Sequence, residues 1–225
     1  MGTGAVSFQF LFSHKAVKLH KPRTPAIMFL MNAQNLKGKL VLIVGPSGSG
    51  KGTVIEELKK RHSDWFFPPS CTTRPPRPSE KDGAVYHFMS EGDFKAGIES
   101  GEFLEWAEVH KKNFYGTLRK PIFSALEQGK TVVREVDIQG FKSIKSLIPA
   151  ENLTSIFLIV ENLDELKARI LKRGPMTEEE ISRRMQSAKK EISESHLCDY
   201  RVPSPHGKIP EITAEVERII LSNKA

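Results

Sequence analysis

The chain has 225 residues, an apolar share of 39% and a formal net charge of +7. This length is enough for one α/β domain with an inserted subdomain, and no apolar run approaches the length of a membrane span. The positive charge favours anionic partners, yet the lysines and arginines are scattered and lack interleaved aromatic residues, so small phosphorylated ligands are favoured over nucleic acid.

Residues 1–35 differ in composition from the rest of the chain: they are basic and contain no acidic residue, and Pro22 and Pro25 interrupt any helix. We expect a disordered basic extension, or an over-extended start with Met28 or Met31 as the true initiator. The alternative is an organelle transit peptide. The only two cysteines have neither metal-ligand spacing nor a disulfide framework, which predicts a reducing compartment. The expected location is the cytoplasm, or an organelle if residues 1–35 are a transit peptide.

An apolar run at 40–44 is followed by a glycine-rich turn and the beginning of a helix, with the GxxxxGK spacing of a phosphate-binding P-loop. Glycines let backbone N–H groups converge on phosphate oxygens, a helix N-terminus adds positive dipole, and Lys51 adds a mobile charge. The usual hydroxyl residue after the lysine is Gly52 here, so Thr53 is the candidate hydroxyl for Mg²⁺. The alternative is a turn that binds no ligand. The predicted ATP-binding residues are Gly45, Pro46, Ser47, Gly48, Ser49, Gly50, Lys51, Gly52 and Thr53.

From Leu36 onward, strand and helix patterns alternate, which predicts a mostly parallel sheet. We expect core strands at 40–44, 131–136, 154–160 and near 198–202. We expect helices at 51–62, 91–100, 119–128, 163–172, 177–195 and 210–222. Residues 69–117 break this alternation and hold four prolines, which indicates an insert. The predicted fold is a domain at 36–225, with an α/β P-loop core flanked by helices (36–68, 118–164 and 189–225), a small α+β insert (69–117) and a helical lid (165–188).

The insert carries polar side chains suited to a phosphorylated ligand. Arg74 and Arg77 stand three residues apart on a proline-stiffened segment, and guanidinium groups bind phosphate oxygens bidentately. The alternative for this segment is a solvated basic loop. Glu105 lies inside an apolar run, where it either accepts two hydrogen bonds from a guanine base or points to water. Tyr115 and Thr117 offer further hydroxyl groups unless they belong to an ordinary turn.

Two further groups of charged residues follow the insert. Glu135 and Asp137 end a strand of the buried type, and acids at the carboxyl end of a parallel strand sit where such sheets bind ligands. They can orient Mg²⁺ through water. Arg169, Arg173 and Arg184 flank a Gly-Pro turn and can close over a transferring phosphoryl group. The alternative for the arginines is an exposed, charged pair of helices.

Taken together, these segments resemble guanylate kinase, the P-loop nucleoside monophosphate kinase that phosphorylates GMP. The match extends from about Leu36 to the C-terminus, and the motif Thr-Thr-Arg-x-x-Arg-x-x-Glu…Gly-x-x-Tyr-x-Phe at 72–88 is specific to that family. The resemblance implies transfer of the ATP γ-phosphoryl group to GMP, and also to dGMP, with Mg²⁺ and in purine nucleotide metabolism. It implies GMP and ATP as substrates, implies no nucleic-acid or membrane partner, and leaves the oligomeric state open.

The resemblance also implies roles for individual residues. The GMP pocket would be formed by Ser70, Arg74, Arg77, Glu80, Tyr86, Glu105, Tyr115 and Thr117, with Glu135 or Asp137 nearby. Its phosphate would be held by Arg74, Arg77, Tyr86 and Tyr115, whereas Ser70 and Glu105 would read the base. The implied catalytic residues are Lys51, Arg169, Arg173 and Arg184. The candidates for holding Mg²⁺ through water are Thr53 and Asp137.

The sequence departs from the family pattern at two places. Arg134 stands where many members have an apolar residue. The family's Asp-Tyr-Val-Val-x-Asn-Asp stretch beside the donor base reads Asp-Tyr-Arg-Val-Pro-Ser-Pro-His at 199–206, so Ser204 takes the asparagine position and leaves the donor preference open. The rival functions are a catalytically silent scaffold module, a kinase for another monophosphate and a nucleic-acid-binding protein. The intact P-loop argues against the first, and Glu105 and Ser70 argue against the second.

Overall fold

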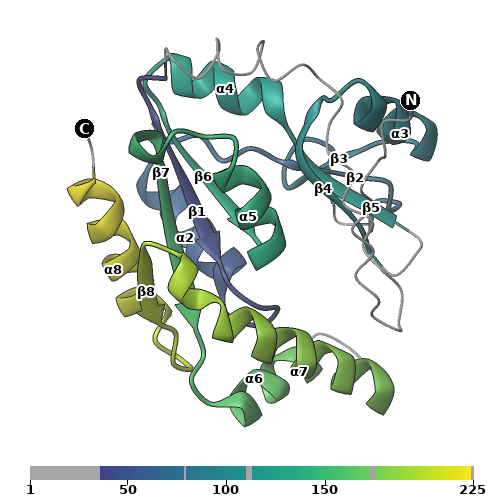
Figure 1. Cartoon of the computed structure of the whole chain (residues 1–225). Helices are drawn as coiled ribbons and strands as arrows, with labels where there is room; N and C mark the ends of the chain where they lie inside the picture. The colour runs from purple at the N-terminus through teal and green to yellow at the C-terminus, as the bar shows by residue number, and fades with distance from the viewer. Residues whose placement is uncertain (1–35, 79, 110–112, 173–175, 224–225) are drawn as a thin grey trace, which may run out of the picture.

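The computed structural model describes residues 36–78, 80–109, 113–172 and 176–223 (Figure 1). The predicted N-terminal extension at 1–35 lies outside the described residues, and so does Arg173. Within the described part of the chain, no helix is both long enough and apolar enough to cross a membrane. Both cysteines are free and buried.

A four-stranded parallel sheet forms the core of the molecule. Its strands are β1 (Lys39–Val44), β6 (Thr131–Val136), β7 (Leu153–Ile159) and β8 (Tyr200–Pro203). They lie in the order β6-β1-β7-β8, so the first strand of the sequence occupies the interior of the sheet. Because parallel strands end at one common edge, the turn after β1 and the acids at the end of β6 lie at the same edge.

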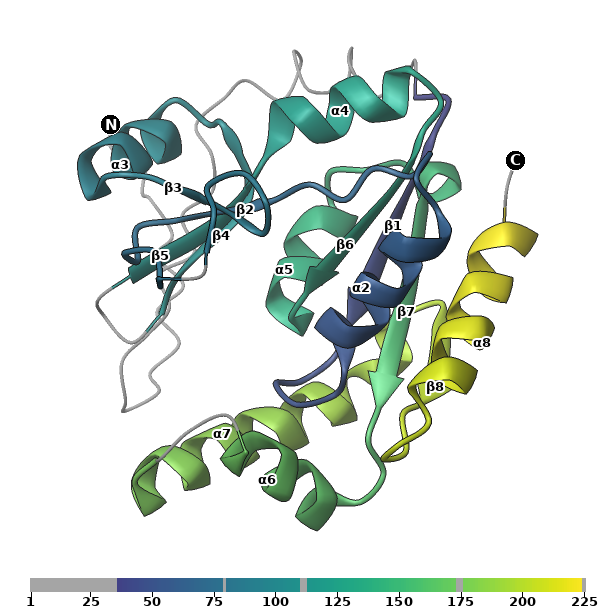
Figure 2. The same ribbon diagram turned by 180° about the vertical axis from the view of Figure 1, so that it is seen from behind.

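Helices cover both faces of this sheet (Figures 1 and 2). The covering helices are α2 (Lys51–Arg61), α4 (Arg119–Glu127), α5 (Ile138–Lys145) and α8 (Ile209–Ser222). Successive residues of β1 point to opposite faces: Leu40 and Leu42 pack with α4 and α5, whereas Val41 and Ile43 pack with α2 and α8. A strand buried on both faces must be apolar throughout, which is why the run at 40–44 contains no polar residue.

A second four-stranded sheet lies beside the core (Figure 1). Its strands are β2 (Ser70–Thr72), β3 (Tyr86–Phe88), β4 (Phe103–Val109) and β5 (Asn113–Leu118), and α3 (Glu91–Glu99) accompanies them. The order is β3-β2-β5-β4, with β5 antiparallel to both of its neighbours. Phe94 and Phe103 stack with their ring centroids 4.2 Å apart and pack with Cys71. The second sheet therefore has a hydrophobic cluster of its own.

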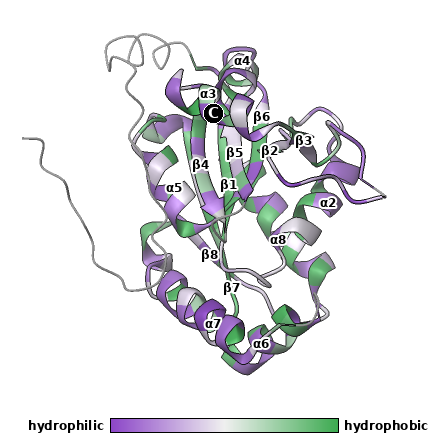
Figure 3. Cartoon of the chain, turned by 90° about the vertical axis from the view of Figure 1, so that its right-hand side faces the viewer, coloured by the Kyte–Doolittle hydropathy of each residue, from purple (hydrophilic) through white to green (hydrophobic). Residues whose placement is uncertain are grey.

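Two further helices, α6 (Leu163–Leu171) and α7 (Glu178–Ser193), form a pair at one end of the core sheet (Figure 1). Asn162 caps the first helix, and Thr177 caps the second by accepting a hydrogen bond from the backbone N–H of Glu180. Leu166 and Ala188 are buried between the helices. Hydrophilic and hydrophobic residues are mixed along α7 and α8 (Figure 3), as expected of helices with one buried face.

The mixed α/β fold with a parallel sheet flanked by helices confirms the predicted fold class. Every strand and helix expected at the stated ranges occurs, with ends that differ by a few residues; β8 begins at Tyr200, and α7 ends at Ser193 before a short 3₁₀ turn, η2 (Ser195–Leu197). Another 3₁₀ turn, η1 (Ala150–Asn152), precedes β7. The pattern does not predict α5, because this helix follows β6 without a loop and contains Gly140.

Candidate functional site

The turn between β1 and α2 has the geometry of an anion cradle. Gly45, Gly48 and Gly50 have φ values of 148°, 88° and 94°, a region that side chains with a Cβ rarely enter. The turn leads directly into α2, whose first residue is Lys51. The Lys51 ammonium donates hydrogen bonds to the Gly45 carbonyl at 2.6 Å and the Pro46 carbonyl at 3.0 Å. A helix N-terminus, backbone N–H groups and one cation thus meet at the edge of the core sheet.

Glu135 of β6 lies between this turn and the second sheet. A Cβ placed on Gly52, in the first turn of α2, would lie 3.8 Å from the Glu135 Oε2 atom. On the other side, burial raises the pKa of Tyr86 in β3, and the negative charge of Glu135 raises it further. One carboxylate is therefore close enough to act on both the P-loop helix and the second sheet.

A guanidinium group is held in a fixed position beside two tyrosines of the second sheet. Arg74 donates two hydrogen bonds of 2.9 Å to the two carboxylate oxygens of Glu80, and this pairing raises the pKa of Arg74. The backbone N–H of Arg77 donates to Glu80 at 2.7 Å. The Arg74 guanidinium lies 5.3 Å from the ring centroid of Tyr86, whose ring meets that of Tyr115 edge-on at 6.1 Å. Glu80 therefore orients the segment from Arg74 to Arg77 beside the two tyrosines.

Glu105 does not point to water. It is paired across the strands with Thr117, and the Thr117 hydroxyl donates a hydrogen bond of 2.5 Å to its carboxylate. Burial raises the pKa of Glu105, while the positive charge of Arg134 and the Thr117 hydrogen bond oppose that increase. Arg134 of β6 also donates to the Thr117 hydroxyl at 3.0 Å and to the Ser70 hydroxyl at 2.7 Å. Four polar residues from separate strands therefore form one hydrogen-bonded group.

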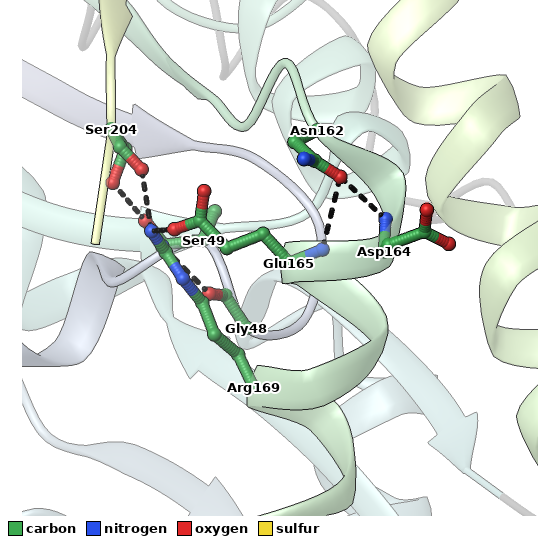
Figure 4. A network of polar contacts seen from close by, with 7 residues as sticks. All are labelled: Gly48, Ser49, Asn162, Asp164, Glu165, Arg169 and Ser204. Atoms are coloured by element: carbon green, nitrogen blue, oxygen red, sulfur yellow. Dashed lines mark hydrogen bonds and ion pairs between the residues drawn. The ribbon is translucent and has the colours of Figure 1, made fainter.

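The three arginines of the predicted lid have different surroundings. Arg169 of α6 donates hydrogen bonds to the Ser204 carbonyl at 2.8 Å and the Gly48 carbonyl at 3.4 Å, and it pairs with Glu165 (Figure 4). These contacts with two backbone carbonyls and with the Glu165 carboxylate favour a positioning role over direct contact with a phosphoryl group. Arg184 of α7 pairs with Glu180 at 2.8 Å. Arg173 lies outside the described residues.

Ser204, in the segment after β8, points towards the P-loop (Figure 4). Its hydroxyl donates a hydrogen bond of 2.8 Å to the Ser49 carbonyl (Figure 4). Its backbone N–H donates to the Ile159 carbonyl. The residue is only 2% exposed. Ser204 therefore joins the segment after β8 to the P-loop, and its one side-chain hydrogen-bond donor is not available to a donor base.

Sequence reasoning missed one acidic residue of this region. Glu191 of α7 is close enough to Lys51 and Asp137 for their charges to act on its carboxyl group. Burial raises the pKa of Glu191 to about 7, and the positive charge of Lys51 opposes the increase. A glutamate on a long, polar helix has no sequence signal that distinguishes it from its exposed neighbours.

The residues predicted to hold Mg²⁺ have modest ligand capacity. Thr53 is exposed in the first turn of α2, and Asp137 accepts a hydrogen bond of 2.7 Å from the backbone N–H of Gly140, which caps α5. Within the described ranges, no group of three or more His, Cys, Asp or Glu side chains could hold a metal ion. Mg²⁺ usually keeps several waters and binds one or two carboxylates together with substrate phosphates, and Glu135 and Asp137 suit that mode.

Comparisons with known proteins agree with this geometry. The family model for guanylate kinase matches residues 37–223. The guanylate kinase of Campylobacter jejuni is 44% identical over 168 residues, covering 74% of this chain and 80% of that protein. That of Synechococcus sp. strain JA-3-3Ab is 41% identical over 179 residues, covering 80% and 77%. The crystal structure of guanylate kinase from Anaplasma phagocytophilum has a TM-score of 0.66 at 27% identity, covering 84% of this chain and 87% of that one. The chain therefore belongs to the guanylate kinase family.

Proposed function

We propose that this ATP:GMP phosphotransferase binds the ATP phosphates on the P-loop and GMP on the second sheet. The observation that carries the proposal is the place of Glu135, whose carboxylate lies beside the first turn of α2 and whose charge raises the pKa of Tyr86. A donor on the loop and an acceptor beside the tyrosines would bring their phosphates together near this residue. The activity follows from membership of the family, whereas the division between the two sites is our inference.

The guanine base is assigned to Glu105, Ser70 and Thr117. A carboxylate only accepts hydrogen bonds, which suits the N1–H and the exocyclic amine of guanine and repels the unprotonated N1 of adenine. The phosphate of GMP is assigned to Arg74, Arg77, Tyr86 and Tyr115. Because these contacts are to the base and phosphate, we extend the proposal to dGMP.

Transfer needs no covalent intermediate with the protein. An oxygen of the GMP phosphate attacks the γ-phosphorus, and the bond from that phosphorus to the bridging oxygen of ADP breaks. Lys51 neutralises charge on the donor phosphates, and Arg173 and Arg184 add positive charge when the lid closes. Arg169 holds the lid helix against the loop. The protein's contribution is positioning and charge neutralisation.

Mg²⁺ is proposed to accompany ATP, held through water by Glu135 and Asp137 and near the Thr53 hydroxyl. When bound, it would neutralise phosphate charge. The proposed location is the cytoplasm, or an organelle if residues 1–35 are a transit peptide.

An assay of ADP release with GMP, dGMP, AMP, UMP and CMP as acceptors tests the proposal. We expect turnover with GMP and dGMP only.

We also expect Glu105→Gln to raise the KM for GMP sharply while the fold is kept. Sites that hydrogen-bond a polar group of the substrate discriminate against analogues that lack this group by about 10⁴–10⁵. Glu108→Gln is the matched control, because Glu108 lies on the opposite face of the same strand. Equal rates with GMP and AMP, or unchanged selectivity in Glu105→Gln, would remove Glu105 from the site.

A further inference from the structure

Arg134 is a charged residue in the middle of a strand of the buried type. Its neighbours on the same face of β6, Val132 and Val136, pack into the core. The Arg134 side chain instead reaches the second sheet and the segment before it, and donates hydrogen bonds to Thr117, to Ser70 and, at 3.2 Å, to the Pro68 carbonyl. A partly buried guanidinium needs such partners, and Arg134 finds three of them beside the residues assigned to guanine.

The direction of these hydrogen bonds constrains the hydroxyl groups. A guanidinium can only donate, so the Ser70 and Thr117 oxygens both act as acceptors towards Arg134. The Thr117 hydrogen is then directed to Glu105, at an oxygen–oxygen distance of 2.5 Å. The Ser70 hydrogen is left to donate to a ligand. A hydroxyl that donates matches the carbonyl O6 of guanine and opposes the 6-amino group of adenine.

Arg134 also acts on Glu105 through its charge. Burial and the negative charge of Asp137 raise the pKa of Glu105, and the positive charge of Arg134 acts in the opposite direction. A neutral side chain at 134 would leave this carboxyl group with less support for its ionised form. The ionised form is the one that accepts two hydrogen bonds from guanine.

We propose that Arg134 is a specificity-determining positioning residue, which fixes the hydrogen-bond polarity of the guanine pocket so that Ser70 donates and Glu105 accepts. This inference rests on the proposed function, because it takes Ser70, Glu105 and Thr117 as the groups that read the base. Arg134 acts through these side chains and need not touch GMP.

The test compares Arg134→Met, which keeps length without charge, with Arg134→Lys, which keeps charge without the planar fork. Steady-state kcat and KM for GMP and AMP are measured at saturating ATP, and GMP affinity is measured without ATP. For Arg134→Met we expect a GMP KM about 10–100-fold higher, a similar loss of affinity and at least about tenfold lower selectivity for GMP over AMP, with kcat at saturating GMP little changed. Arg134→Lys should recover part of the affinity, because it keeps one charged donor.

Arg61→Met is the matched control, because Arg61 pairs with Glu217 on α8, on the other side of the core; its GMP kinetics should equal those of the wild type. Folded Arg134→Met with wild-type KM and selectivity would overturn the inference. Should that variant not fold, Arg134→Lys decides alone: unchanged KM and selectivity would overturn the inference, and a selective loss in KM would support it. Failure of the proposed function looks different, since the wild type would then not distinguish GMP from AMP or Glu105→Gln would be silent.

Discussion

The contacts and the charge of Lys51 predict a specific defect when it is removed. Its ammonium donates to two carbonyls of its own loop. In the proposed complex, its charge would neutralise the donor phosphates. We expect Lys51→Ala to lower kcat by about 10²–10³ while GMP still binds, because stabilisers of transferring charge typically contribute that much. Steady-state kinetics with a GMP titration measure both quantities. Lys60→Ala, at an exposed position of the same helix paired with Glu57, is the control. A near-normal rate in Lys51→Ala would contradict the P-loop assignment.

The arginines are expected to divide into two kinetic classes. Arg74 and Arg77 belong to the segment that Glu80 orients, so they would grip the acceptor phosphate before and during transfer. Their alanine variants should mainly raise the KM for GMP. Arg173 and Arg184 would engage when the lid closes, so their loss should mainly lower kcat. Kinetics of the four variants test this division, and the reverse assignment of KM and kcat effects would refute it.

The sequence is enough to name most of the proposed site residues, but it does not give the direction of their side chains. The motif at 72–88 gives Arg74, Glu80 and Tyr86 because residue type and spacing are enough to define it. Ser204 stays ambiguous in the sequence, since a serine after a strand can point to a ligand or to a neighbouring loop. The hydrogen bond to the Ser49 carbonyl shows that Ser204 points to the neighbouring loop. It joins residues that are 155 positions apart in the sequence, so no local pattern predicts it.

At the level of elements, α7 is expected to give a pH-dependent stability through Glu191. Burial raises the pKa of this carboxyl group from 4.5 to about 7. The folded state therefore disfavours the charged form: the contribution of Glu191 to stability is full below pH 4.5 and is lost as pH rises towards 7. We expect Glu191→Gln to raise Tm relative to the wild type at about pH 8, and this advantage to disappear near about pH 4.5.

Thermal unfolding of both proteins across this pH range measures the effect. Glu179→Gln is the control, because Glu179 lies on the same helix with a side chain that is 73% exposed. An advantage of Glu191→Gln that does not change with pH would mean that burial of the charge is not its cause.

Helices and strands with strong local sequence signals could be predicted. The exception is α5, and the reason is physical. Thr177 precedes α7, and its hydroxyl caps the helix as the capping box predicts, although the Glu180 side chain pairs with Arg184 instead. α5 has its cap, Asp137, at the end of a strand, where an acid is equally typical of a ligand site. Because Asp137 fits both a helix cap and a ligand site, the sequence does not predict the helix that follows it.

Across the whole molecule, three distant parts of the chain meet at the proposed donor site: the P-loop, α6 and the segment after β8. Ser204 is committed to the P-loop, and Pro203 and Pro205 remove two backbone donors from this segment. We expect weak discrimination between donor bases, with GTP and dATP nearly as effective as ATP. The measurement is kcat/KM for ATP, dATP, GTP and CTP at saturating GMP. A preference for ATP over GTP beyond about a hundredfold, or about 2.7 kcal/mol, would show that other residues read adenine.

The overall architecture was the most predictable level, because it depends on patterns that are repeated along the chain. Apolar runs alternating with amphipathic helices predict a parallel core, and the run at 40–44 is apolar for the simple reason that both its faces are buried. The link between the two sheets through Arg134 could not be predicted in the same way. Arg134 lies in the core sheet, whereas Thr117 and Ser70 lie in the second sheet. No local sequence pattern indicates that these residues come within hydrogen-bond distance of one another.

The hydrogen bonds around Arg169 have a consequence for the entropy change when a donor nucleotide binds. The hydrogen bonds from Arg169 to Gly48 and Ser204, with that from Ser204 to Ser49, tie the loop to two other segments through contacts within the protein itself. The conformational freedom of the loop is therefore lost when the chain folds, not when the donor binds. A donor nucleotide meets a rigid cradle and loses mainly its own freedom, so most of the favourable contact energy is retained as affinity.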